Sequence, residues 1–237
     1  MPKTYVIIPT YNEAENIEAL LRGIIKLNLP ELTALVVDDN SPDGTGGIVD
    51  KLAKENPSIK VMHRFQNRGR GSAGIDGFKY ALKEGASYII EMDADFSHHP
   101  RYIPAFLESI RGYDLVLGSR YIPGGKDADR SFFRRLITSF ARLYIRSMLG
   151  LKVKDVTSGY RCFRSEVLAA IDLDHLISTG PSIVSEILYQ AALNNYRIHE
   201  IPIVFEDRKK GKTKLNLWIL LKTLYMVYRF RKIYRKI

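Results

Sequence analysis

Two aspartates, Asp93 and Asp95, stand one residue apart at the end of an apolar run that is typical of a buried strand. In an extended chain the side chains at positions i and i+2 point to the same side, so both carboxylates can face one ligand. Like charges this close repel each other unless a cation or hydrogen-bond donors neutralise them. A hard divalent ion that carries a diphosphate would do so. The alternative interpretation is a solvated loop rich in aspartate.

Other charged residues extend this pattern. Acidic residues follow two earlier apolar runs, at Glu13, Asp38 and Asp39. Carboxylates can hold a metal ion and the polar edges of a nucleotide, and Arg and Lys can neutralise phosphates. The combination predicts a nucleotide-diphosphate ligand with a divalent ion. The basic residues gather in later segments, at Arg120, Arg134, Arg135, Arg208, Lys212 and Lys214.

Three other kinds of site are weakly supported. The sequence contains no G-x-x-x-x-G-K-[ST] phosphate-binding loop. Residues 69–74 include Gly-x-Gly but lack the acidic residue that a dinucleotide site needs about twenty positions later. His98 and His99 are adjacent, so in an extended chain they point to opposite sides, and no third histidine is near. We therefore do not expect them to bind a metal.

The elements that position these residues alternate between strand and helix, which predicts an α/β fold with a mostly parallel central sheet flanked by helices. Open sheets of this kind bind ligands at the carboxyl ends of their strands. The expected strands are 4–8, 35–37, 59–62, 88–92, 114–118, part of 155–163, and 198–205. The expected helices are about 13–27, 46–55, 73–84, 101–111, 132–149, 165–171 and 183–194.

The charge of the chain is unevenly distributed. Its net charge is +10, but residues 208–237 hold eleven of the 36 basic residues and no acidic ones, which leaves the rest close to neutral. This distribution argues against a nucleic-acid-binding body. The single cysteine, Cys162, excludes an internal disulfide and fits a reducing compartment. The start of the sequence shows no signal-peptide pattern.

The C-terminal segment 215–237 predicts a basic amphipathic helix. Its apolar stretch is too short and too charged for a membrane span. Ile219, Met226, Phe230, Ile233 and Ile237 fall on one side of such a helix, opposite Lys222, Arg229, Lys232 and Lys236. We expect it to lie on an anionic membrane surface. The alternative is a helix packed on the protein with a solvated basic face. The expected division is 1–214 for the catalytic domain and 215–237 for this helix.

Four motifs occur in an informative order: residues 9–13 (PTYNE), 37–45 (VDDNSPDGT), 92–100 (MDADFSHHP) and 118–121 (GSRY). Together they resemble family 2 inverting glycosyltransferases with the GT-A fold, and most closely the dolichol-phosphate (polyprenyl-phosphate) mannose synthases. Residues 155–161 (DVTSGYR) and 207–215 (DRKKGKTKL) strengthen the narrower match. The resemblance covers residues 4 to about 215.

The resemblance implies roles for individual residues. The donor nucleotide sugar would contact Pro9, Tyr11, Glu13, Val37, Asp39, Asp93, Ala94, Asp95, Arg120, Arg208 and Lys214. A divalent metal ion, Mg²⁺ or Mn²⁺, would be held by Asp95 together with Ser97. The acceptor phosphate would contact Arg120, Arg134, Thr138 and Ser139. Asp93, Asp95 and Arg120 would be the catalytic residues.

The implied reaction is transfer of mannose from GDP-mannose to dolichyl or polyprenyl phosphate with inversion. Residues 180–186 (GPSIVSE) depart from the usual pattern of these synthases, although Glu186 is retained. A UDP-sugar donor such as UDP-glucose therefore stays open, and a nucleic-acid-binding module with a basic tail is an alternative from another class. We expect a peripheral protein on the cytoplasmic face of a membrane, with no nucleic-acid partner. A separate membrane-anchoring subunit is left open.

Overall fold

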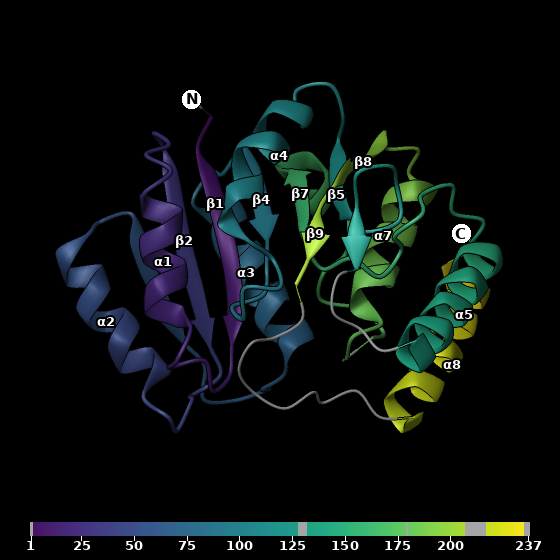
Figure 1. Cartoon of the computed structure of the whole chain (residues 1–237), viewed down its shortest axis with the longest axis horizontal. Coiled ribbons are helices and arrows are strands. Elements are labelled where there is room, and N and C mark those ends of the chain that lie inside the picture. The colour runs from purple at the N-terminus through teal and green to yellow at the C-terminus, as the bar shows by residue number, and fades with distance from the viewer. Residues whose placement is uncertain (1, 128–131, 179, 207–216, 235–237) are drawn as a thin grey trace.

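The computed structural model describes residues 2–127, 132–178, 180–206 and 217–234, with side chains for all of these except 132–136 and 217–219. Figure 1 shows a central sheet with helices on both sides. The strands are β1 Thr4–Thr10, β2 Leu32–Asp38, β3 Ile59–His63, β4 Tyr88–Glu91, β5 Leu115–Ser119, β6 Lys126–Asp127, β7 Arg161–Arg164, β8 Ile198–Pro202 and β9 Val204–Phe205. The helices are α1 Ile17–Ile25, α2 Thr45–Glu55, α3 Arg70–Lys83, η1 Pro100–Tyr102, α4 Ile103–Ser109, α5 Phe132–Leu149, α6 Ser165–Ala169, α7 Ile183–Leu193 and α8 Leu217–Tyr234.

The sheet has the strand order β3-β2-β1-β4-β7-β5-β8. All neighbouring strands run parallel except at β7, which is antiparallel to both β4 and β5. The predicted α/β fold with a mostly parallel sheet is therefore confirmed. The short parallel pair β6–β9 was not predicted, because two-residue strands leave no periodic pattern in a sequence.

The two faces of the sheet are covered by different helices. Along β1, Tyr5 and Ile7 belong to one buried cluster, whereas Val6 and Ile8 belong to the other. This alternation is the two-residue period of a strand, and both faces are apolar because both are covered. Helices α1, α2 and α4 pack on the second face. Helices α3, α5, α6, α7 and α8 contribute to the first.

Two helices begin at other residues than expected. Helix α1 begins at Ile17, not near Asn12 or Glu13. Asn12 has a positive φ of 61° and its backbone N–H donates to the Ser41 hydroxyl, so this residue belongs to the loop. Helix α3 begins at Arg70, three residues before the predicted start. The later start of α1 leaves residues 11–16 in the loop at the carboxyl edge of the sheet, whereas the earlier start of α3 places Arg70 in the first turn of that helix.

Helix α8 packs against α5 and α7, and Figure 1 shows α5 and α8 together, far from α1 and α2. Met226, Val227 and Phe230 are buried in the core. Met226 and Phe230 belong to the apolar side of the helix that was expected to contact a membrane. In the structure these two side chains contact the protein core instead. Across the described residues, no helix combines the length and apolarity required for a membrane crossing.

Candidate active site at the carboxyl edge of the sheet

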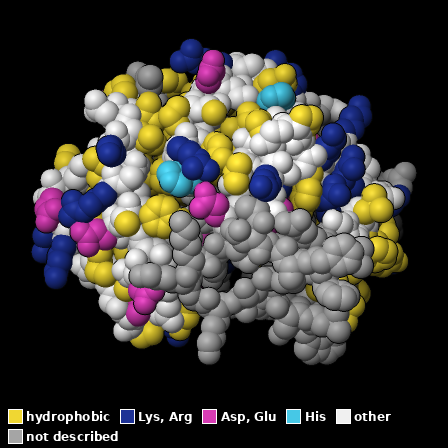
Figure 2. Space-filling model, in the orientation of Figure 1, with side chains coloured by type: hydrophobic (Ala, Val, Ile, Leu, Met, Phe, Trp, Pro, Cys, Tyr) yellow, Lys and Arg dark blue, Asp and Glu magenta, His cyan; other side chains and the backbone are white. Residues whose placement is uncertain are grey.

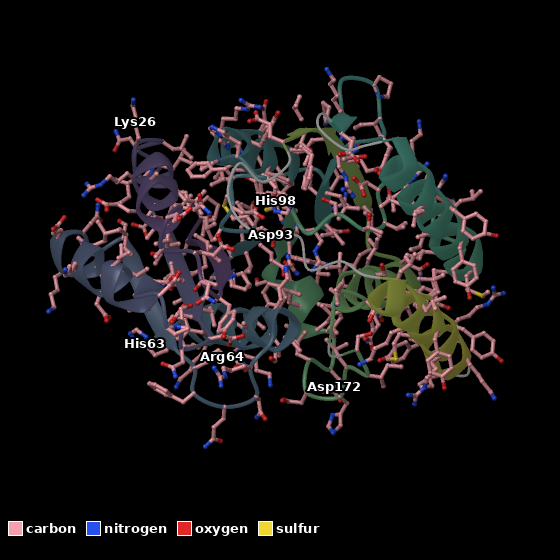
Figure 3. The ribbon with its side chains drawn as sticks, turned by 60° about the horizontal axis from the view of Figure 1, so that its bottom comes forward. Lys26, His63, Arg64, Asp93, His98 and Asp172 are labelled. Carbon is pink, nitrogen blue, oxygen red and sulfur yellow. The ribbon has the colours of Figure 1, made fainter. Side chains whose placement is uncertain are left out.

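The predicted site residues follow adjacent strands. Strands β2, β1 and β4 are neighbours in the sheet, and Thr10 at the end of β1 is in register with Asp38 at the end of β2. Because parallel strands end at the same edge, the loops that carry Tyr11, Asp39 and Asp93 meet there. Figure 3 looks toward this edge and shows Asp93 next to His98 near its centre.

Asp38 holds the first two loops together. Its Oδ1 accepts hydrogen bonds from the hydroxyls of Thr10, at 2.9 Å, and Ser41, at 2.6 Å. Its Oδ2 accepts from the Ser41 backbone N–H at 3.0 Å. Asp38 is 1% exposed. The neighbouring Asp39 is almost as buried, at 3% exposed, so burial does not separate the two aspartates.

Asp39 is bound by a residue that the sequence analysis did not identify. Arg64 donates to its Oδ1, and the Gly69 backbone N–H donates to its Oδ2 at 2.6 Å. Arg64 also contacts Asp76 at 2.7 Å and the Asn67 carbonyl at 2.7 Å. The position of Arg64 directly after β3, which pairs with β2, is a signal that could have revealed it.

The structure brings the predicted metal ligands together in one turn. The Asp95 Oδ1 accepts from the Ser97 hydroxyl at 2.6 Å and from the Ser97 backbone N–H at 3.1 Å. Phe96, between them, has a positive φ of 62°, which makes the tight turn. Both side chains are nearly buried. A carboxylate and a hydroxyl held side by side offer the hard oxygen ligands that Mg²⁺ and Mn²⁺ prefer.

Asp93 is neutralised by a second arginine that was not predicted. Arg70 donates to the Asp93 Oδ1 from Nε at 2.9 Å and from Nη2 at 2.7 Å. Its Nη1 lies 3.4 Å from the Glu91 Oε1. Arg70 belongs to the basic Gly-x-Gly segment, which here supplies an arginine to the carboxylates. A guanidinium thus provides part of the charge compensation that the sequence analysis assigned to a metal ion.

The two histidines hydrogen-bond to backbone groups near the site. The His98 Nδ1 accepts from the Asp93 backbone N–H at 2.9 Å, and its ring stacks on Tyr160 at 5.0 Å. Burial lowers the pKa of His98, which favours the neutral ring. The His99 Nδ1 accepts from the Arg101 backbone N–H at the start of η1. No group of three or more His, Cys, Asp and Glu suited to a metal occurs in the described ranges.

Arg120 is buried and forms a fork with Asp155. Its Nε and Nη2 donate to the two Asp155 oxygens at 2.7 and 2.8 Å, and Nη2 also donates to the Thr157 hydroxyl at 2.9 Å. Its guanidinium lies 5.2 Å from the centre of the Phe205 ring. Burial opposes the charge of Arg120, but Asp155 raises the Arg120 pKa above its ordinary value. The side chain is therefore a fixed cation, next to the motif at residues 155–161.

The remaining donor candidates differ in how accessible they are. Tyr11 is 40% exposed at the edge of the sheet, and Pro9 is half-buried. Val37 and Ala94 are buried as whole residues, at 0% and 3% exposed, so neither presents accessible surface to a donor. Glu13 accepts from the Asn16 side-chain amide at 3.0 Å.

The acceptor candidates lie on α5, but only part of them is described. Thr138 and Ser139 are half-buried on this helix. Arg134 is in the same helix, and its side chain lies outside the described residues, as do Arg208 and Lys214 entirely. The grouping of these residues around a phosphate stays a prediction.

Glu186 forms hydrogen bonds with three groups that lie away from the carboxylates described above. Its two oxygens accept from the backbone N–H groups of Ile177, at 2.9 Å, and Ser178, at 2.8 Å, and from the Tyr234 hydroxyl at 2.5 Å. The residue is fully buried. Glu186 therefore fixes the loop before α7 to the end of α8, and this structural demand accounts for its retention within the divergent stretch 180–186.

Comparison with solved structures supports the fold. Glucosyl-3-phosphoglycerate synthase from Mycobacterium tuberculosis, in a complex with Mn²⁺, UDP and glucosyl-3-phosphoglycerate, superposes with a TM-score of 0.67 and 18% identity. The match covers 95% of this chain and 77% of that one. At this identity the likeness concerns the fold alone, and it confirms the expected GT-A architecture.

Relatives with higher identity share most of their length with this chain. Undecaprenyl-phosphate mannosyltransferase from Micrococcus luteus is 44% identical over 90% of this chain and 88% of its own length. Polyprenol monophosphomannose synthase from Mycolicibacterium smegmatis is 41% identical, with 90% and 81% covered. Dolichol-phosphate mannosyltransferase from Pyrococcus furiosus is 37% identical, with 97% and 64% covered. The family model "Glycosyl transferase family 2" matches residues 5–172. The chain is therefore a member of glycosyl transferase family 2.

Proposed function

We propose that this protein transfers mannose from GDP-mannose to a polyprenyl phosphate, with inversion at the anomeric carbon. The observation that carries the proposal is the carboxyl edge of the sheet, where Asp93, Asp95 and Ser97 converge in one loop beside Arg70. The names of the relatives, which are 37–44% identical, support the choice of sugar and acceptor.

The donor would lie across this edge. Tyr11 and Asp39 would contact the nucleoside, and Asp95 with Ser97 would hold a divalent ion on the diphosphate. When bound, such an ion offsets the charge that develops on the leaving diphosphate. Arg208 and Lys214 would contact the same diphosphate from the segment after β9. This assignment gives Asp95 a binding role and leaves the charge of the leaving group to cations.

The acceptor needs little activation, because a phosphate monoester already carries negative charge at neutral pH. No strong general base is therefore required, and Asp93 and Asp95 serve as binders in this proposal, without shuttling protons. Arg120, Arg134, Thr138 and Ser139 would hold the acceptor phosphate in line with the anomeric carbon. A single displacement from this position inverts that centre.

Calorimetric titration tests the donor. We expect GDP and GDP-mannose to bind in the presence of Mg²⁺ or Mn²⁺, and UDP and UDP-glucose to bind more weakly. The UDP-sugar alternative gains its support from the divergent residues 180–185, and tighter binding of UDP-glucose would favour it. Formation of a lipid-linked mannose from GDP-mannose and a short polyprenyl phosphate then tests the acceptor. A chain that binds none of these nucleotides would contradict the proposed function.

A membrane surface is the proposed site of the reaction, since the acceptor is a lipid. Among the described residues, the outer surfaces of α5 and α8 expose large hydrophobic side chains: Ile137, Phe140, Leu143, Leu221, Tyr225, Tyr228 and Ile233. Both helices contain basic residues and no acidic ones. Figure 2 shows Lys and Arg beside hydrophobic side chains on this side of the molecule. The observation extends the proposed docking surface from the segment 215–237 to α5.

Charge reversal tests this surface. Lys222→Glu with Arg229→Glu should weaken binding to anionic liposomes, because attraction to a charged surface is lost. Lys26→Glu with Lys51→Glu is the matched control: both residues are exposed, and they lie at α1 and α2 on the opposite side. Added salt should weaken binding of the unmodified protein. Equal liposome binding by both double variants would contradict the docking surface.

Binding to oligonucleotides separates this proposal from the alternative of a nucleic-acid-binding module. We expect none at physiological salt, since the excess of positive over negative charge is concentrated in the C-terminal region and α5. Peripheral attachment to the cytoplasmic face of a membrane is part of the proposal. A separate anchoring subunit stays open, and co-purification from a native membrane extract would test it.

A further inference from the structure

Four charged side chains form an alternating row that leads away from the carboxylate edge. Asp93 accepts from Arg70, whose Nη1 lies 3.4 Å from the Glu91 Oε1. The other Glu91 oxygen accepts from Arg161 at 2.5 and 3.2 Å. Arg161 donates in turn to the Val184 carbonyl at 2.9 Å, at the start of α7. Strands β4 and β7 and helices α3 and α7 are thus linked by one row of ion pairs.

The row is buried at one end and accessible at the other. The side chains of Glu91 and Arg161 are 2% and 1% exposed, whereas Arg70 and Asp93 are 33% and 28% exposed. Glu91 is thus buried with Arg161 as its partner, and its other oxygen lies next to the Nη1 of Arg70. The Nε and Nη2 of Arg70 contact Asp93, which a ligand can approach.

Two glycines provide the space that this arrangement needs. A Cβ atom at Gly159 would lie 2.7 Å from the Arg70 Nη2, which is closer than real contacts allow. A Cβ atom at Gly74 would lie 3.2 Å from the Glu91 Oε1. A larger residue at position 159 would displace the Arg70 guanidinium, and one at position 74 would crowd the Glu91 carboxylate. The Gly159 backbone therefore leaves space that the guanidinium occupies beside Asp93.

Charge balance suggests what Arg70 does. Two carboxylates, Asp93 and Asp95, would repel an anionic diphosphate placed beside them, and one divalent ion bound at Asp95 does not neutralise Asp93 as well. We propose that Arg70, held by Glu91 and Arg161, is a positioning residue that neutralises Asp93 and so removes its repulsion of the donor's diphosphate. This inference rests on the proposed function, because it takes the ligand to be a nucleoside diphosphate sugar.

A double-mutant cycle tests the inference by calorimetry, with GDP-mannose and Mg²⁺ as the probe. Arg70→Gln should raise the Kd by about tenfold or more, as expected for loss of a charge-assisted interaction. Arg68→Gln is the matched control, since Arg68 lies two residues away, is exposed, and carries the same charge; its Kd should change less than about threefold. If Arg70 acts through Asp93, then adding Asp93→Asn to Arg70→Gln should restore part of the affinity.

The outcomes separate the two proposals. If the unmodified protein binds neither GDP-mannose nor UDP-glucose, the proposed function and this inference both fail. If it binds, but Arg70→Gln binds as tightly as Arg68→Gln, the inference alone is overturned. It is also overturned if Arg70→Gln weakens binding and Asp93→Asn restores none of it, since a purely structural role predicts that result. Should circular dichroism show that Arg70→Gln is unfolded, the same cycle with Arg70→Met decides, because methionine keeps an apolar stem and removes the charge.

Discussion

Replacing Phe230 by alanine should destabilise the entire protein, although the residue lies in the last helix. Its ring is fully buried, and its centre lies 6.5 Å from that of Tyr189 in α7. Met226 and Val227, on the same side of α8, are buried with it. An appended helix would tolerate the change, whereas a helix that completes the core would not.

The expected cost follows from this burial. Truncation of a buried phenylalanine to alanine costs about 3–5 kcal/mol, from lost transfer free energy and from the cavity left behind. Domains of this kind are stable by about 5–15 kcal/mol. Phe230→Ala should thus remove a large fraction of the free energy of unfolding. Tyr228→Ala is the matched control, because Tyr228 is 51% exposed on the same helix; we expect about 0.5 kcal/mol or less.

Urea denaturation measures both effects. Circular dichroism reports on the whole protein, and the single tryptophan, Trp218, belongs to α8. The two signals should change at the same urea concentration, since α8 and the sheet share one core. Fluorescence that changes well before circular dichroism would refute this reasoning, and so would equal stability of the two variants. The same argument means that a chain ending at residue 215 should be unstable, so point substitutions are the better test of membrane binding.

Three further predictions concern the site. Asp95→Ala should abolish transfer and metal-dependent donor binding while circular dichroism stays native-like; unchanged turnover would contradict the metal assignment. Arg208→Ala and Lys214→Ala should each weaken donor binding by about tenfold to a hundredfold, as measured by calorimetry; wild-type kinetics in both would exclude a diphosphate contact. Burial works against ionisation of Asp155, but Arg120 holds its pKa below the ordinary value. Stability from this pair is therefore present above about pH 4 and lost as pH falls through the lowered pKa. Asp155→Asn should lower the free energy of unfolding by about 3–5 kcal/mol at pH 7, because Arg120 stays buried without its partner. Below about pH 4, the stability of this variant should depend less on pH than that of the unmodified protein.

The parts of the fold that could be predicted are those encoded by neighbouring residues. Buried parallel strands appear as apolar runs, so they were predicted. The resemblance paired Asp95 with Ser97 as metal ligands, and their role in binding a metal stays a prediction. The ion pair between Arg70 and Asp93 joins residues 23 positions apart, and nothing local in the sequence specifies it. Arg64 and Asp39 pair across 25 positions for the same reason.

For the C-terminal helix, the sequence pattern could not predict what covers its apolar side. An amphipathic pattern establishes that one side of a helix will be covered, but it does not say whether protein or lipid covers it. Here Met226 and Phe230 are covered by α5 and α7, while Tyr225 and Tyr228 remain exposed. The antiparallel orientation of β7 could not be predicted either, because a strand of four residues contains no pattern that indicates its direction in the sheet.

The placement of β7 also determines the order in which the sheet can form. Strands β1 to β4 pair among themselves, so residues 4–91 can assemble as soon as they are synthesised. Strand β5 is fully buried in the finished protein, yet its partners are β7 and β8, which begin only at residues 161 and 198. During synthesis, the apolar strand Leu115–Ser119 therefore stays unpaired until long after it leaves the ribosome. Such late, non-local pairing makes folding slow and leaves this strand open to aggregation in the meantime.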